Sequence, residues 1–177
     1  MPSAQRRSPL WRLWLFLVVI SGIVWLGGVN VRAIIGNDLL RPGTLEFEEF
    51  LSPEAEREIF RLLSLTSLLI IASYCVLLFS SVLFLTSSPY RMKEHGWLLM
   101  SAILFFLFVP VEAFTMYLDG KMIYQEFFTT LDNAAFRELF VRRMGALKGA
   151  PVVALLCYYT IVGLVVFQPF RKKQEAA

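Results

Sequence analysis

The stretch "LLIIASYCVLLFSSVLFLT", residues 68–86, decides the fold of this chain. It contains no charged residue, and as a helix with a rise of about 1.5 Å per residue it is roughly 28 Å long. The hydrocarbon core of a bilayer is about 30 Å thick. The stretch therefore predicts a transmembrane helix.

Three further apolar blocks have a similar length, and 57% of all residues are hydrophobic and 15% aromatic. The four predicted transmembrane helices are residues 11–29, 68–86, 97–118 and 151–167. They leave two long outer loops, 30–67 and 119–150, and one short inner loop, 87–96. We predict an all-α integral membrane protein, in which residues 1–177 form a single four-helix bundle.

The first block could also be read as a signal peptide, because Arg6, Arg7 and Arg12 precede it like a charged n-region. Its apolar run is longer than the usual 7–15 residues of such a signal, and no small-x-small cleavage site follows it. We therefore expect a retained first helix.

The distribution of basic residues predicts the orientation. Lys and Arg are nearly even between the two sides, but they are denser close to the helix ends beside the N-terminus, the short loop 87–96 and the C-terminus. Both termini are thus expected in the cytoplasm, in a plasma membrane or a bacterial inner membrane. These flanks also explain the net charge of +3, so no nucleic-acid partner is predicted.

Several enzyme classes lack their residues in this sequence. Cys75 and Cys157 lie in separate apolar blocks without a C-x-x-C motif, which argues against a thiol oxidase. His95 is the only histidine, which argues against a haem b protein. The sequence contains no Gly-rich phosphate loop, G-x-S-x-G or H-E-x-x-H motif. We predict neither enzymatic activity nor a cofactor or metal.

The outer loops are too long to be simple connections. In "SPEAEREIFRLL" (52–63), Ser52 is a typical N-cap, Pro53 suits the first helical position and acidic residues follow, so a helix should run into the block 68–86. The segments 44–51 and 122–131 are aromatic and partly alternating. They could pair as a small sheet or rest at the headgroup level.

The stretch "LDNAAFRELFVRRMGALKG" (131–149) predicts a helix lying at the outer surface. Its helical repeat has an apolar and a basic side, formed by Leu131, Ala135, Leu139, Arg142 and Arg143.

Small residues at the head of the last block predict close helix packing. Gly145 and Gly149 form a G-x-x-x-G motif there. A second ridge of small residues and a glycine pair near the end of the first block are further packing candidates: Ala146, Ala150, Ala154, Gly27 and Gly28.

Polar residues inside the blocks repeat at helical spacing and should face the bundle interior. They are Ser67, Tyr74 and Ser81 in the second block, and Ser101, Glu112, Thr115 and Asp119 along the third. Glu112 is expected about 22 Å along its helix, in the outer third of the membrane.

An ionised carboxylate at that depth needs a partner or water. The residues expected at the same level are Asn30, Arg32, Arg61 and Lys148. Glu112 could form a buried ion pair with Arg32 or Lys148, serve as a proton or cation site, or extend to the interface.

The motifs "WLGGVNVRAIIG" (25–36) and "FRELFVRRMGALKG" (136–149), with the acidic helix at 52–63, resemble a small four-helix membrane family of unknown function. That family includes a platinum-resistance-associated transmembrane protein and lies near bacterial copper-resistance membrane proteins. The family places a histidine before its last helix, where this chain has Met144 or Gly145. Methionine near the outer face suits a soft metal, yet in such chains it usually packs.

Three hypotheses on function follow. The sequence favours a non-enzymatic structural or accessory subunit in the lipid bilayer, binding other membrane proteins or a second copy of itself through the small-residue ridge and outer loops. The alternative is a small transporter or ion- or proton-handling protein with Glu112 as the intramembrane site. A lipid-modifying enzyme would need a cluster of Asp, His or Ser at one interface, which the sequence does not indicate.

Overall fold

The structure is a computed structural model that describes residues 10–41, 43–47, 52–90, 92–129 and 132–169. Its elements are α1 (Leu10–Asp38), α2 (Pro53–Ser87), α3 (Gly96–Leu107), α4 (Val109–Phe128), α5 (Asn133–Met144), the short 3-10 helix η1 (Ala146–Gly149) and α6 (Ala150–Phe167). Four segments are long and apolar enough to cross a membrane: Leu10–Asp38, Pro53–Ser87, Gly96–Phe128 and Asn133–Phe167. The all-α class and the four long apolar helices are thereby confirmed, and they suit an integral membrane protein.

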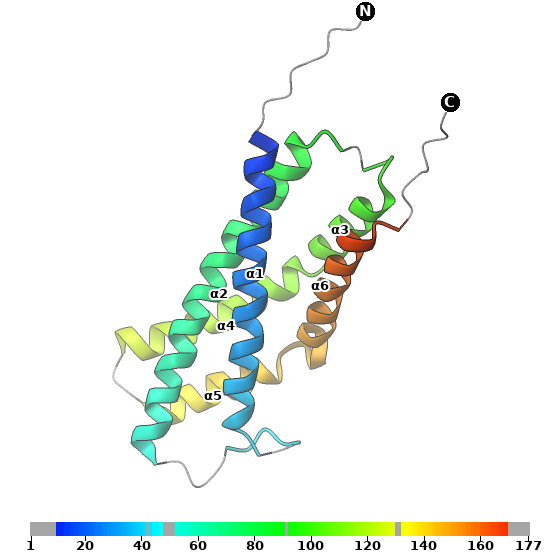
Figure 1. Cartoon of the computed structure of the whole chain (residues 1–177). Helices are drawn as coiled ribbons and strands as arrows, with labels where there is room; N and C mark the ends of the chain where they lie inside the picture. Colours follow the sequence, from blue (N-terminus) through cyan, green and yellow to red (C-terminus); the bar gives the residue numbers. More distant parts are fainter. Residues whose placement is uncertain (1–9, 42, 48–51, 91, 130–131, 170–177) are drawn as a thin grey trace, which may run out of the picture.

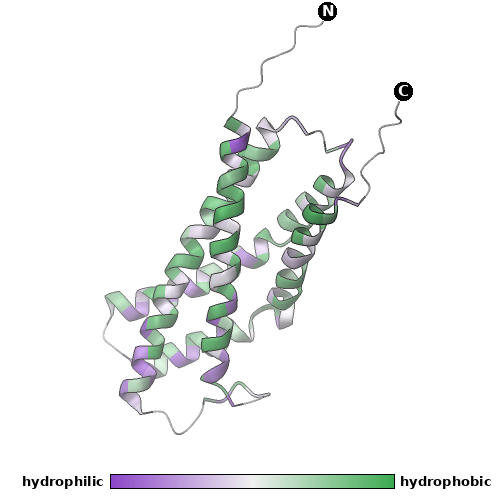
Figure 2. Cartoon of the chain, in the orientation of Figure 1, coloured by the Kyte–Doolittle hydropathy of each residue, from purple (hydrophilic) through white to green (hydrophobic). Residues whose placement is uncertain are grey.

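The helices form two pairs joined by a crosswise layer (Figure 1). α1 packs along α2, α3 packs along α6, and α4 and α5 run across one end of the α1–α2 pair. The start of α1 and the end of α6 lie at the other end, which we call the terminal end. Hydrophobic residues cover the helices toward the terminal end, while hydrophilic residues gather around the crosswise layer (Figure 2).

Both long helices extend beyond the predicted apolar blocks. α1 continues to Asp38, and α2 begins at Pro53 as the capping signal predicted, with the Ser52 side chain accepting a hydrogen bond from the Ala55 N–H at 3.2 Å. The pair is close where Gly28 faces Ile70, because a β-carbon at Gly28 would lie 3.0 Å from that side chain. At Gly27 a β-carbon would meet nothing within 4 Å, so Gly28 alone of this glycine pair is a packing position.

The third apolar block bends and forms two helices, whereas a single helix was predicted for 97–118. Phe108 separates α3 from α4 with φ −96° and ψ 0°, and Pro110 lies in the first turn of α4. Proline has no N–H and its ring clashes with the preceding turn, so a new helix starts more easily there than the old one continues. α3 is 12 residues long, or about 18 Å, and α4 then runs across the bundle (Figure 1).

α5 forms within the predicted segment 131–149, but its buried face differs from the prediction. Phe136 and Phe140 are buried, whereas Ala135 and Leu139 are half-buried and Leu131 lies outside the described residues. Phe136 stacks on Phe60 of α2 with ring centroids 4.2 Å apart. The surrounding core also contains Leu39, Leu40, Leu63 and Met122. The predicted surface helix therefore packs against the ends of α1 and α2.

The possible sheet between 44–51 and 122–131 does not form in the described part of these segments. Residues 122–128 belong to α4, and Phe47 instead makes an isolated bridge with Leu40. Residues 48–51 and 130–131 lie outside the described part.

The link between α5 and α6 breaks the predicted G-x-x-x-G face. Leu147 and Lys148 have φ values of 57° and 46°, and Gly149 has φ 89°, so Gly145 and Gly149 do not share one helix surface. The chain needs these left-handed residues because the crosswise α5 must turn into α6. Of the alanine ridge, Ala146 and Ala154 are buried and Ala150 is half-buried.

Gly149→Ala should destabilise the protein by about 1–2 kcal/mol, because an L-residue in the left-handed region brings its β-carbon against the backbone. The space around Gly149 is open, so the loss comes from the backbone and not from crowding. Thermal unfolding in detergent measures it. Gly163→Ala is the matched control, since Gly163 lies inside α6 with open space around it and should gain about 0.5–1 kcal/mol. Equal effects of the two changes would contradict the argument.

Candidate functional site

Asp119 of α4 lies between two arginines. Arg32 of α1 donates from Nη1 and Nη2 to the two carboxylate oxygens at 2.5 Å, and Arg143 of α5 donates from Nε to Oδ1 at 3.2 Å. The side chains of Arg32 and Asp119 are only 6% and 2% exposed. A two-pronged guanidinium–carboxylate contact is among the strongest polar interactions in proteins. This cluster fastens the crosswise layer to α1.

The cluster replaces the ion pair predicted for Glu112. Arg32 binds Asp119, which follows Glu112 by two helical turns, and Lys148 is exposed in the left-handed link. Arg61 is also exposed, on α2. Asn30 does reach across the bundle, because its Nδ2 donates to the Tyr159 hydroxyl of α6 at 2.7 Å. The structure therefore brings Arg32 and Asn30 into interhelical contacts, while Arg61 and Lys148 stay outside the cluster.

Glu112 lies in the first turn of α4 and is half-buried. Among the described residues, no hydrogen bond or ion pair reaches its carboxylate. Arg143 and Asp119 are the charged groups that act on it electrostatically. Glu112 is thus close to the arginine–aspartate cluster without being part of its hydrogen bonds.

The buried carboxylate of Glu56 shows the usual arrangement. Arg137 donates from Nε and Nη2 to its two oxygens at 2.5 and 2.8 Å, and Asn133 donates to Oε2 at 3.2 Å. Buried charges are normally paired in this way. Glu56 and Asp119 each have two side-chain donors, and Glu112 differs from both.

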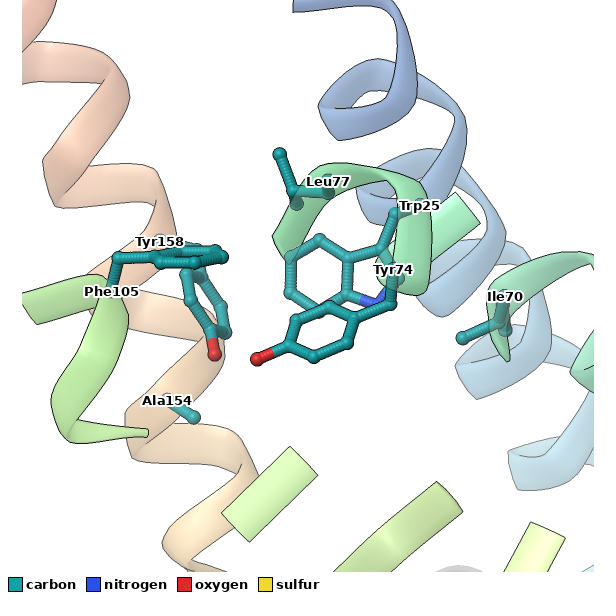
Figure 3. Packing of buried hydrophobic residues seen from close by; sticks show 7 residues of the cluster. All are labelled: Trp25, Ile70, Tyr74, Leu77, Phe105, Ala154 and Tyr158. Atoms are coloured by element: carbon teal, nitrogen blue, oxygen red, sulfur yellow. The ribbon is translucent and has the colours of Figure 1, made fainter. Parts of the chain in front are cut away.

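An aromatic cluster fills the bundle interior, with one ring from each of α1, α2, α3 and α6 (Figure 3). Trp25 of α1 has its ring centroid 4.6 Å from Tyr158 of α6 and 5.3 Å from Tyr74 of α2. Phe105 of α3 lies 6.1 Å from both tyrosines. This cluster joins the α1–α2 pair to the α3–α6 pair.

The polar atoms of this cluster have no hydrogen-bond partner in the described structure. They are Trp25 Nε1 and the hydroxyls of Tyr74 and Tyr158, all of which are buried. The two hydroxyls point toward one another across the bundle interior (Figure 3) and interact with each other, although their geometry is not that of a regular hydrogen bond. Glu112 interacts electrostatically with both tyrosines. Buried polar groups without partners are rare and often mark functional sites.

Most buried serines of the same helices are satisfied locally, although the hydroxyl of the buried Ser64 on α2 also has no partner in the described structure. The Ser67, Ser73 and Ser80 hydroxyls donate to carbonyls one turn earlier, at 2.6–2.8 Å. Of the predicted inward stripe on this helix, Ser67 and Tyr74 are buried and Ser81 is half-buried. Trp25 and Tyr158 were missed, since an aromatic residue in an apolar block gives no signal of a polar role.

A metal site has no support from the described residues. They contain no group of three or more His, Cys, Asp or Glu side chains that could hold a metal ion. The methionines that the sequence predicted near the outer face have different surroundings. Met122 is buried in the core cluster that contains Phe60, Met116 packs against the aromatic cluster, and Met144 is exposed.

Comparison with protein-family models, curated proteins and solved structures gave no match. The resemblance to the four-helix membrane family therefore stays a prediction, and function must be argued from the buried polar groups themselves.

Proposed function

We propose that the chain is a small, non-enzymatic integral membrane protein that handles protons, with Glu112 as the group that binds and releases them. The supporting observation is the contrast among the four described carboxylates that are buried or half-buried, Asp119, Glu56, Glu126 and Glu112, of which Glu126 pairs with Arg57 at 3.7 Å. Asp119 and Glu56 are each held by two side chains, whereas Glu112 makes no such bond among the described residues. A carboxylate that is fixed by arginines cannot readily take up a proton, and one that is unfixed can.

The charges around Glu112 suit both of its protonation states. Arg32 from α1 and Arg143 from α5 outnumber Asp119 from α4, so the cluster carries one excess positive charge that an ionised Glu112 balances. When protonated, the Glu112 carboxyl becomes a donor, and the hydroxyls of Tyr74 and Tyr158, with which it interacts electrostatically, are the candidate acceptors. Neither state leaves Glu112 without complementary groups.

Access to Glu112 follows from the proposed orientation. In the proposed orientation, which follows the positive-inside rule, the terminal end lies in the cytoplasm, in a plasma membrane or a bacterial inner membrane. α3 then carries the chain about 18 Å across the membrane before Glu112. The carboxyl group would exchange protons with the outer side.

Glu112→Gln should reduce proton flux into proteoliposomes by at least about tenfold while the protein stays folded. The amide copies the protonated carboxyl in shape and charge, so the variant should match the wild type in thermal stability at low pH. A trapped pH-sensitive dye measures the flux. Glu138→Gln, at an exposed position on α5, is the matched control.

Two outcomes would overturn the proposal. The first is undiminished flux in Glu112→Gln, and the second is a wild-type flux no greater than that of empty vesicles. Tyr74→Phe adds a second test, because removing one unpaired hydroxyl should slow the flux without unfolding the protein.

An accessory subunit is the second candidate function. The observation in its favour is the outward face of α6, where Val152, Leu156 and Val166 are exposed and a β-carbon at Gly163 would meet nothing within 4 Å. A glycine between apolar residues gives another helix room to approach closely. Purification in a mild detergent with a stoichiometric partner, or as a dimer that Gly163→Leu dissociates, would support this function.

A further inference from the structure

We propose that α4 lies in the headgroup layer of the membrane and binds the lipid surface through its outward face, instead of completing a third crossing. This inference concerns the outward face of α4, whereas the proton-handling proposal concerns Glu112 in the first turn of that helix. The bend at Phe108 separates α4 from α3, and α4 then runs across the α1–α2 pair (Figure 1). A crossing helix would continue along the bundle.

The two sides of α4 differ sharply. Thr115, Leu118, Asp119 and Met122 are buried against the rest of the protein, at the spacing of one helix face. Phe114, Tyr117, Tyr124 and Phe128 are exposed on the outward side, by 40%, 56%, 61% and 73%. Lys121 lies between Tyr117 and Tyr124, so the five residues follow one another at intervals of three and four positions, the spacing of one helix face. We call them the aromatic stripe.

The composition of the aromatic stripe suits the headgroup layer. The exposed faces of α1, α2 and α6 are dominated by aliphatic residues, as lipid tails require. The stripe combines two phenylalanines, two tyrosines whose rings end in a polar hydroxyl, and the ammonium group of Lys121, and Tyr is enriched where a membrane meets water. Lys121 Nζ lies 4.6 Å from the Tyr117 ring centroid, and the Tyr124 and Phe128 rings stack at 5.7 Å. A lysine that lies along a ring can direct its charge toward phosphate groups.

The depth of α4 agrees with this placement. Arg32 lies 21 residues beyond Trp11 on α1, or about 31 Å, so its partner Asp119 puts α4 near the outer edge of a hydrocarbon core of about 30 Å. The Arg32–Asp119–Arg143 cluster on its inner side holds α4 at the level where α1 leaves the membrane. A helix whose inner side is held by the ion pairs of Asp119 and whose outer side carries exposed aromatic residues is suited to the membrane interface.

Spin labels along α4 test the proposal in vesicles of equal parts phosphatidylcholine and phosphatidylglycerol. Single cysteines at Tyr117, Tyr124 and Phe128, in the full chain with Cys75 and Cys157 changed to Ser, report depth through collisions with oxygen and a water-soluble nickel chelate. We expect all three labels at one depth, close to the phosphates. A crossing helix would change depth by about 16 Å between Tyr117 and Phe128.

Labels at Leu15, Ile23 and Ile34, on the exposed face of α1, are the matched control and should show the depth gradient of a crossing helix. A gradient along α4 equal to that along α1 would overturn the proposal, and so would labels on α4 that meet only water. Thermal unfolding checks each labelled variant. Phe114 or Phe127, which are also exposed on α4, replaces a position whose label unfolds the protein.

Discussion

Asp119→Asn should lower the free energy of unfolding by about 3–5 kcal/mol, the loss expected when one member of a buried ion pair is removed. The change leaves Arg32 and Arg143 close together without their shared carboxylate, and Arg32 is almost completely buried. Denaturant unfolding in detergent micelles measures the loss. Asp38→Asn, at an exposed position at the end of α1, is the control and should change stability by less than about 0.5 kcal/mol.

A double variant distinguishes a stability loss caused by an unpaired buried charge from a stability loss caused by disturbed packing. Adding Arg32→Met to Asp119→Asn removes the buried charge that lost its partner, and should therefore recover part of the stability. A loss in Asp119→Asn no larger than in Asp38→Asn would show that the cluster does not hold the crosswise layer in place.

Trp25→Ala is expected to have the other large effect, again about 3–5 kcal/mol, because it leaves a cavity where three helices meet. Trp25 is 3% exposed and its ring contacts those of Tyr74 and Tyr158. Trp25→Phe should retain most of the stability, since it keeps an aromatic ring and removes an N–H that has no partner in the described structure.

Trp14→Ala is the matched control for Trp25→Ala. Trp14 also lies on α1 but is half-buried, with its ring edge-on to Phe79 at 6.2 Å. Thermal unfolding should show a much smaller loss for Trp14→Ala. Equal losses would mean that the aromatic cluster does not join the two helix pairs.

Local patterns were sufficient for most of the helices. Hydropathy located the four apolar blocks, and the Ser52–Pro53 signal located the start of α2, because both depend on neighbouring residues only. The extension of α1 to Asp38 was missed because Asn30 and Arg32 lower the apolar average there. Their partners, Tyr159 and Asp119, lie far away in sequence.

The candidate site was predictable only in part. In the sequence, Glu112 and Arg32 were recognisable as charged residues within or beside apolar blocks. Which residue each of them contacts depends on how α4 turns after Phe108. That turn moves Asp119, not Glu112, to Arg32. The orphaned hydroxyls of Tyr74 and Tyr158 depend on the packing of four helices, which no local pattern contains.

The distance in sequence between Arg32 and Asp119 has a consequence for biosynthesis. The two residues are 87 positions apart, so at about 5–20 residues per second Asp119 leaves the ribosome roughly 4–17 s after Arg32. Arg143 follows Asp119 by a further 24 positions. In the proposed membrane placement, Arg32 would have water or lipid phosphates as its partners during this time. The first two helices therefore cannot reach their final state during insertion, and the structure closes only when the segment that ends in Arg143 has been made.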